Sequence, residues 1–388
     1  MYCFVICVCI LSVLSVQGQN EKYDIGGYLH YNQSVLMEQQ WQVHNQFHNR
    51  INTEWHIDTA LTAGVELRNR FFYGDIARQQ PELIDMLDAQ VGYIDMSTAY
   101  GDGNSWVASS VVDRLYLDYT YKKMQIILGR QRINWGRNIV WNPHDVFNTA
   151  SYFDVDYVEK SGSDAVRMMY YTNETAHAEW AVKKNADSSI TAGALYKWNT
   201  HGYDVQCVAG VFEDDELFAG IGWEGYVHSF SVRGEMNMFY PHSYTRDTTP
   251  TVLFGLGTDY MTSSGIFLQA ECLYNQYAEV YNLESLLMQN PSVLVGGGTA
   301  GTVQQVKSIS FDEFSAFVSA QYSINPLCTV GLSGMYFMES QGFFLNPSVS
   351  YSLAENFEIS CIGQYFNFTI RNAREDYTIA YGLLSWSF

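Results

Sequence analysis

The chain has 388 residues, a formal net charge of −20 and 16% charged residues, where ordinary soluble domains carry about 25%. The acidic balance excludes nucleic acid as a partner, because such binding needs a basic surface. After residue 18 no stretch approaches the length of apolar chain that a spanning helix needs, yet 15% of the residues are aromatic. A β-barrel in lipid accounts for this mixture, because it combines an apolar exterior and aromatic girdles with a polar lumen.

Residues 1–18 predict a secretory signal peptide. An apolar run, Phe4–Val16, leads into a cleavage site with the small residues Val16 and Gly18 at its −3 and −1 positions. No Lys or Arg precedes the run, so the amino terminus alone supplies the positive charge. The run is also shorter than the ~20 residues of a membrane anchor. The mature chain is therefore expected to be one exported domain, residues 19–388.

Period-two alternation in segments of roughly ten residues dominates the rest of the chain, as the strands of a membrane barrel require. Residues 313–323 show it well, with Phe317 as the lone apolar residue on the polar face. Charged residues occupy alternate positions in three further segments. They are expected to line a water-filled lumen and comprise Glu66, Arg68, Arg114, Asp118, Arg233 and Glu235.

The predicted fold class is all-β, a closed transmembrane antiparallel β-barrel of about eighteen strands, with sixteen as the alternative. The predicted strands are 23–33, 47–57, 60–73, 108–121, 124–133, 163–172, 176–183, 188–198, 201–213, 216–225, 227–240, 251–262, 264–276, 310–323, 327–338, 342–352, 355–368 and 376–388.

The connections between these strands sort into two sets, which supports the barrel independently. One set is short throughout and is expected to face the periplasm. The other contains all of the long loops, which are expected to be extracellular: 34–46, 74–107, 134–162, 241–250 and 277–309.

Residues 129–148 form the most distinctive stretch of the sequence, and read GRQRINWGRNIVWNPHDVFN. The segment resembles one in porin-like outer-membrane barrels of Bacteroidota and in related alginate-export-like barrels, in which GRQ leads through WG into NPxDxFN. The resemblance implies a large single-chain outer-membrane barrel, but fixes no substrate, since these families include general channels and specific exporters. The matching residues are Gly129, Arg130, Gln131, Trp135, Gly136, Asn142, Pro143, Asp145, Phe147 and Asn148.

The same segment has a physical interpretation. Pro143 fixes a turn in which Asn142 and Asp145 can bond nearby amides, and such a loop is well placed to fold into the lumen and narrow it. A basic cluster of Arg130, Arg132 and Arg137 would then face Asp145, Asp154 and Asp156 across a constriction and filter solutes by charge. The alternative is a structural turn that braces or plugs the wall. The candidate constriction residues are Arg130, Arg132, Arg137, Asn142, His144, Asp145 and Asn148.

The C-terminal strand ends on an aromatic residue, Phe388, after alternating Gly382, Leu384 and Trp386. This pattern resembles the signal that the barrel-assembly machinery reads in outer-membrane proteins. Membrane lipid and lipopolysaccharide are the other expected partners.

No catalytic motif, metal motif or cofactor site is predicted. His44 and His48 lack the Glu of an HExxH motif and are expected to be exposed where a loop enters a strand. Asp214 and Asp215 fit a solvated tight turn. The cysteines outside the signal peptide each stand alone in an alternating segment, which indicates lipid-facing residues; they are Cys207, Cys272, Cys328 and Cys361.

The leading functional prediction is a porin-like channel for passive diffusion of small polar solutes, in the outer membrane of a Gram-negative bacterium. Three alternatives stay open. A substrate-specific transporter or exporter would carry a polysaccharide or a hydrophobic molecule along a continuous track. An outer-membrane hydrolase would bring Ser and His, or Asp and His, together at the outer rim. A surface adhesin would use the 277–309 loop.

Overall fold

The computed structural model describes residues 22–37, 41–79, 83–88, 92–102, 105–149, 152, 162–241, 249–280, 306–310, 312–370 and 373–388. The predicted signal peptide and two of the acids predicted to face the basic cluster, Asp154 and Asp156, lie outside these residues. No helix within the described ranges has the length and apolar character needed to cross a membrane.

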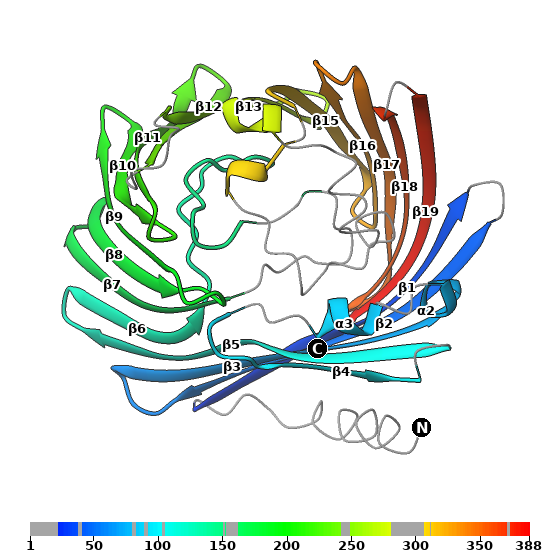
Figure 1. Ribbon diagram of the computed structural model, residues 1–388, viewed down its shortest axis with the longest axis horizontal. Helices are drawn as coiled ribbons and strands as arrows, with labels where there is room; N and C mark the ends of the chain where they lie inside the picture. The colour runs from blue at the N-terminus through cyan, green and yellow to red at the C-terminus, as the bar shows by residue number, and fades with distance from the viewer. Residues whose placement is uncertain are drawn as a thin grey trace.

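The chain folds as a closed antiparallel barrel of eighteen strands (Figure 1). The prediction of eighteen strands is confirmed, and the alternative of sixteen is wrong. The wall strands are β1 (Tyr23–Met37), β2 (Gln42–His56), β3 (Leu61–Gly74), β5 (Trp106–Tyr121), β6 (Met124–Gln131), β7 (Ser163–Asn173), β8 (Ala176–Lys184), β9 (Ile190–Thr200), β10 (Tyr203–Phe212), β11 (Glu216–Val227), β12 (Phe230–Pro241), β13 (Thr251–Met261), β14 (Ile266–Asn275), β15 (Phe314–Asn325), β16 (Cys328–Phe337), β17 (Gly342–Ala354), β18 (Phe357–Ile370) and β19 (Ala373–Ser387).

The first and last strands close the ring. β1 pairs with β19 from Tyr28 opposite Ser387 to Met37 opposite Thr378. The terminal residue takes part, because the Gly27 amide donates to the Phe388 carbonyl at 2.9 Å and the Phe388 amide donates back at 3.0 Å. Closure leaves no sheet edge, which is the condition for a sheet to stand in hydrocarbon where unpaired backbone groups are costly.

The two faces of the wall have the chemistry that the alternation predicts. On β12, Met236 and Met238 are exposed on the outer face, whereas Arg233 and Glu235 are buried inside. The same division holds around the ring, so large apolar side chains form an exposed outer belt. Its members include Leu115, Leu117, Leu128, Val166, Trp180, Val182, Leu217, Ile221, Leu256, Leu268, Val318, Leu332, Leu345, Val349, Ile359 and Leu384.

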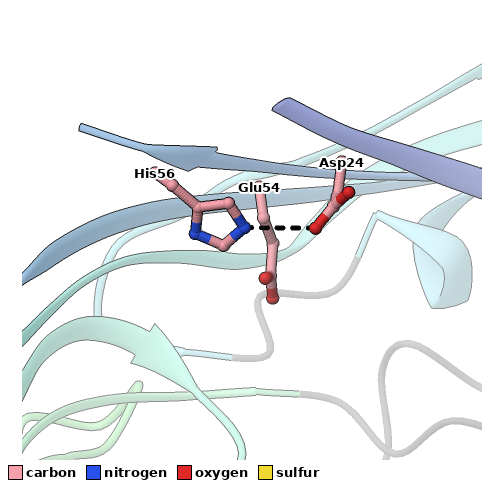
Figure 2. Close-up of side chains that lie close together, drawn as sticks. All are labelled: Asp24, Glu54 and His56. Atoms are coloured by element: carbon pink, nitrogen blue, oxygen red, sulfur yellow. Dashed lines mark hydrogen bonds and ion pairs between the residues drawn. The ribbon is translucent and has the colours of Figure 1, made fainter. Parts of the chain in front are cut away.

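The strand connections also sort as predicted, and the two ends are named here the short-turn end and the long-loop end. Every link at the short-turn end has two to four residues. In several of the two-residue links the first residue has a left-handed backbone, with φ of 54° at Lys122, 51° at His201 and 54° at His228. Both hairpin turn types, I′ and II′, require a positive φ at this position. At this end Nε2 of His56 also lies 3.1 Å from the Asp24 carboxylate (Figure 2).

Two of the predicted loops are largely regular structure. The loop predicted over 34–46 is wrong, because β1 and β2 stay paired as far as Leu36 and Gln42. His44 and His48, expected to be exposed, are buried on the inner face of β2. The chain carries polar residues on both faces here, with Asn32 inside and Gln33 outside, so the sequence shows no contrast between faces.

The 74–107 connection contains two short helices, α2 (Asp75–Gln79) and α3 (Leu83–Leu87), and a short strand, β4 (Ser97–Gly101). β4 pairs beside the upper part of β5 and does not complete a further wall strand. The helices pack inside the rim, where Ala77, Leu83 and Leu87 form a small apolar core with wall residues Phe72 and Val107.

The described parts of the 277–309 connection lie against the long-loop rim as two turns of 3₁₀ helix, η1 (Gln276–Val280) and η3 (Val306–Ser308). Lys307 in η3 forms an ion pair with Glu216 of β11 at 2.8 Å, and its carbonyl accepts from the Asn275 side chain at 2.9 Å. These contacts tie the returning chain to two separate wall strands.

Packed apolar side chains fill much of the interior toward the long-loop end, which differs from the wholly polar lumen that the composition predicts. Phe212, Phe239, Leu253, Phe337 and Phe344 all lie near the long-loop ends of their strands and belong to one buried cluster. The reason is that a part of the chain folds inward and packs against this half of the wall.

Candidate functional site

Residues 132–149, named here the infolded segment, follow β6 and run inside the barrel against its wall (Figure 1). One flank is held by β8, where the Lys183 ammonium donates to the Phe147 carbonyl at 2.8 Å. Beyond the segment, the Tyr152 hydroxyl donates to Ser333 of β16 at 3.1 Å, and the Tyr152 ring meets Phe317 of β15. The predicted infolding of this loop therefore agrees with the structure.

The wall carboxylate of Glu235, on β12, holds the first part of the infolded segment through main-chain amides. It accepts a hydrogen bond from the amide of Arg137, a second from Asn138 at 2.8 Å and a third from His144 at 3.0 Å. The side chain is fully buried. The donors come from two points of the segment, so this one carboxylate holds both points together.

A second wall carboxylate, Glu271 on β14, holds the middle of the segment in the same way. It accepts from the successive amides of Ile139 at 3.1 Å, Val140 at 3.3 Å and Trp141 at 2.7 Å. Successive amides that converge on one anion form a concave anion site, a backbone nest. Each hydrogen bond to a charged group contributes about 1.5–3 kcal/mol, so the two glutamates together fix the path of the segment.

His144 locks the turn that Pro143 starts. Its Nε2 donates to the Met236 carbonyl at 2.9 Å, and its Nδ1 accepts from the Gln206 amide nitrogen at 2.8 Å. These two contacts need the neutral imidazole with its proton on Nε2. Burial in this infolded loop lowers the pKa of His144 to about 4, which keeps the ring neutral near pH 7.

Three inward positions of the wall behind the segment are glycines. A Cβ on Gly220 would lie 2.6 Å from Nε2 of His144, and one on Gly222 would lie 3.1 Å from its Cε1. A Cβ on Gly255 would meet the Asn138 amide at 2.3 Å. These inward positions are left without side chains so that the infolded segment can approach the sheet.

Trp135 anchors the apolar side of the segment. Its ring packs edge-on against Phe147 with centroids 4.8 Å apart, and its Nε1 donates to Glu179 of β8 at 2.6 Å. Glu179 is also paired with Arg167 at 2.7 Å. Asn148 accepts from the Ile133 amide at 2.8 Å, which joins the two ends of the segment.

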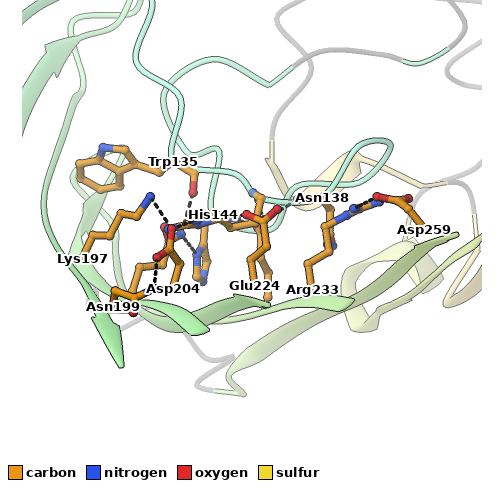
Figure 3. A network of polar contacts seen from close by, with 12 residues as sticks. Trp135, Asn138, His144, Lys197, Asn199, Asp204, Glu224, Arg233 and Asp259 are labelled. Atoms are coloured by element: carbon orange, nitrogen blue, oxygen red, sulfur yellow. Dashed lines mark hydrogen bonds and ion pairs between the residues drawn. The ribbon is translucent and has the colours of Figure 1, made fainter. Parts of the chain in front are cut away.

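The predicted basic cluster is distributed among different partners. Arg130 pairs with Asp164 of β7 at 2.7 Å. Arg137 reaches Glu224 at 3.2 Å and Asp204 at 3.7 Å. Figure 3 shows these two acids on the wall below the segment. The arginines are therefore matched to wall acids and not to Asp145, while Arg132 is half-buried at the start of the segment.

The other predicted constriction residues of the segment are buried and do not line an open passage. In the turn, the Asp145 amide donates to the Asn142 carbonyl at 3.1 Å, so the turn closes through its backbone. The side chains that stay exposed inside the barrel belong to Asn134 and Ile139, which sequence reasoning did not single out. The predicted residues that are buried here are Asn142, His144, Asp145 and Asn148.

Across the barrel, the predicted lumen residues of β3 and β5 form an ion-pair network. Arg50 and Arg68 both bond to Asp113, at 2.6 and 2.9 Å, and Arg114 bonds to Glu66 at 3.0 Å. Asp113 is the extra residue of a β-bulge, since Glu66 pairs with Arg114 while the next residue pairs with Val112. The bulge turns the Asp113 carboxylate inward toward both guanidinium groups.

Two other predicted lumen residues lie lower on the wall. Asp118 accepts from the Gln125 side chain at 2.6 Å. Arg233 forms a two-pronged contact with Asp259, one bond of which is 2.9 Å (Figure 3). Both pairs join neighbouring strands, so they brace the sheet as well as carry charge.

Sequence reasoning missed Glu271, Gln206 and Asp113. Glu271 and Gln206 do occupy inward positions of predicted strands, and an isolated polar residue between apolar neighbours was the available signal. Their partners lie up to 132 residues away in the chain, so no local pattern shows the pairing. Asp113 is aimed by a bulge, which breaks the alternation that the prediction used.

No protein-family model and no curated protein matches the sequence. Solved structures do match. OccAB4 of Acinetobacter baumannii aligns with a TM-score of 0.59 and 10% identity over 95% of this chain and 99% of that chain. OccK9 (OpdG) of Pseudomonas aeruginosa aligns at 0.56 and 11% over 95% and 98%, and OccAB1 of A. baumannii at 0.57 and 8% over 95% and 96%. The chain is thus similar in fold, over nearly its whole length, to the Occ barrels.

Proposed function

We propose that the protein is an outer-membrane channel for passive diffusion of small polar solutes, and that the infolded segment forms its constriction. The strands of the barrel carry an apolar belt on their outer face and many polar side chains on their inner face, which suits a wall between lipid and water. The long-loop end then faces outward and the short-turn end faces the periplasm. No catalytic role is proposed for any residue.

The observation that carries the proposal is the hold on the infolded segment. A loop fixed inside a closed barrel by two buried carboxylates narrows the passage at a constant place. A mobile lid would instead be a segment with few stabilising contacts to the rest of the protein. Fixed narrowing is the arrangement that a diffusion channel needs for selecting solutes by size.

The chemistry of the wall below the segment supports polar cargo. The Glu224 and Asp204 side chains stay 42% and 36% exposed, although both lie near Arg137. Lys197 is beside Asp204 at 3.0 Å. Groups of opposite charge side by side give a local field that orients water and dipolar solutes, and an apolar cargo gains nothing from it.

The likeness to known structures supports the same function. The matching structures are Occ and Opd outer-membrane porins. We propose an outer-membrane location in a Gram-negative bacterium by that analogy. From the terminal aromatic residue Phe388 we propose assembly by the barrel-assembly machinery, with membrane lipid and lipopolysaccharide around the barrel. A dedicated transporter, an adhesin and a hydrolase remain rival hypotheses, and conductance separates the first two from an open channel.

The test is single-channel recording. Purified wild-type protein in a planar bilayer should give discrete ion steps, and a variant with residues 134–147 replaced by a Gly-Ser linker should give larger steps. A gel of heated and unheated samples verifies that the variant barrel is folded. Folded wild-type protein that gives no steps would overturn the channel, and unchanged step size in the linker variant would overturn the constriction.

A further inference from the structure

Three side chains with metal-binding atoms meet at the short-turn end of the wall. Asp24 on β1 lies opposite Glu54 on β2 in the strand register, and His56 follows on the same face of β2. One ligand atom from each of the three lies within 4.8 Å of the others. Figure 2 shows the imidazole of His56 and the Asp24 carboxylate directed at one another, with Glu54 beside them.

The strand register places this group on the inner face. Tyr23 and Trp55, the alternating neighbours, pair with each other and are exposed on the lipid side as stacked aromatics. The carboxylate of Glu54 accepts from the Tyr116 hydroxyl at 2.8 Å, and Tyr116 belongs to the inner face of β5. The three groups therefore line the mouth of the barrel that we assign to the periplasm.

Residues outside the group orient two of its members. The Nδ1 of His56 is 3.1 Å from the Thr62 hydroxyl on β3, which leaves Nε2 directed at Asp24, 3.1 Å away. The Tyr116 hydroxyl holds Glu54 in the same manner. Metal-binding histidines and carboxylates usually have such outer partners, which set the direction of the ligand atom.

The spacing of one pair of ligand atoms also suits a small cation, and the ligand atom of Glu54 lies within 4.8 Å of both. Ligand atoms about 2.0–2.1 Å from Zn²⁺ in a tetrahedron lie about 3.3 Å apart, close to the separation of Nε2 in His56 and Oδ2 in Asp24. One imidazole with two carboxylates is a donor set for transition metals, whereas Mg²⁺ and Ca²⁺ prefer oxygen alone. We propose that Asp24, Glu54 and His56 bind a divalent transition-metal ion of the Zn²⁺ type at the inner rim of the barrel.

The site leaves one coordination position for water, because three protein ligands leave a tetrahedral ion open on one side. Asp24 is 60% exposed and His56 is 36% exposed, so the ion enters from solution without opening the barrel. Occupancy places positive charge at this mouth of the barrel. No linear motif predicts this site, because its ligands come from two strands.

The direct test is calorimetric titration of Zn²⁺ into the folded full-length protein in detergent, purified without a histidine tag. We expect one bound ion per chain, with Ca²⁺ unable to compete. His56→Ala and Asp24→Asn should abolish measurable binding. Thr62→Val, which keeps the ligands but removes the orienting hydroxyl, should weaken binding about tenfold.

The matched control is His228→Ala, which removes an exposed histidine from a turn at the same end and should leave binding unchanged. Wild-type affinity in His56→Ala, or loss of binding in His228→Ala, overturns the site. Equal displacement by Ca²⁺ overturns the transition-metal assignment. Binding is read without conductance, so the site stands or falls independently of the proposed channel.

Discussion

Two parts of the barrel bury carboxylates on the inner wall, and they use them differently. On the side of β12 and β14, Glu235 and Glu271 are met by main-chain amides of the infolded segment. On the side of β3 and β5, Asp113 is met by the guanidinium groups of Arg50 and Arg68. The first arrangement fixes the course of a loop, and the second ties one wall strand to its neighbours. Similar carboxylates therefore shape the passage on one side and stabilise the sheet on the other.

The largest loss of stability is expected in the ion-pair network around Asp113. Asp113→Asn removes the carboxylate charge that the buried Arg50 and Arg68 share, while Arg50 keeps its second partner, Glu66. Breaking a buried pair costs about 3–5 kcal/mol. The temperature at which the barrel unfolds in detergent, read from gel mobility, should fall clearly. Asp118→Asn on the same strand, which loses one partner in Gln125, should have a small effect. Equal shifts in both variants would contradict the difference between the two regions.

Glu271→Gln tests the amide-held side. The amide oxygen keeps one or two of the three bonds to the segment. The new NH₂ group faces N–H donors and accepts nothing from them, so we expect a loss of about 2 kcal/mol in anchoring. Unfolding temperature should change little, while channel noise and proteolysis near residue 139 should rise. Glu358→Gln, an exposed glutamate on β18, is the matched control. A stable, quiet channel in Glu271→Gln would contradict the anchoring role.

Gly220→Ala tests the fit of the segment against the wall. The new methyl group would overlap His144, and overpacking of this kind costs about 1–3 kcal/mol. We expect altered step size with an intact barrel. Gly382→Ala, where a Cβ meets nothing within 4 Å, should behave as wild type, and an effect in that variant alone would contradict the steric account.

The smallest effect is a pH dependence through His144, whose pKa is lowered to about 4 by burial. A released segment takes up a proton near pH 6.5, whereas the anchored one does not. Anchoring is therefore complete above about pH 6.5 and weakens as the pH falls toward 4. Channel noise should grow over this range more steeply in the wild type than in His144→Asn. Equal profiles in both would show that this histidine does not control the segment.

The sequence allowed the barrel to be predicted because most strands contrast an apolar outer face with a polar inner face. This contrast is absent around Ser34 and His44, where both faces are polar, and the paired strands there were therefore predicted as a loop. Phe317, the one apolar residue on a polar face, marked an inward contact with Tyr152. The inward glycines, such as Gly220 and Gly222, likewise indicated that another part of the chain covers the wall at these positions.

The site was predicted less fully than the fold. The turn at Pro143 indicated that the loop enters the barrel, but its anchors lie far along the chain in Glu235 and Glu271. Alternation shows that such acids face inward and does not show what they bind. The pairing of the arginines with wall acids, and not with Asp145, depends on the same long-range geometry.

Because the infolded segment is held through its peptide groups, its sequence can change while its anchoring contacts stay the same. Glu235 and Glu271 hold peptide groups, and peptide groups are the same whatever side chain they carry. Ile139 is bonded to the wall through its amide, and the residue is 48% exposed. Its side chain is therefore free to be exchanged for a charged, polar or bulky one while the frame stays in place, so one scaffold can serve solutes of different kinds.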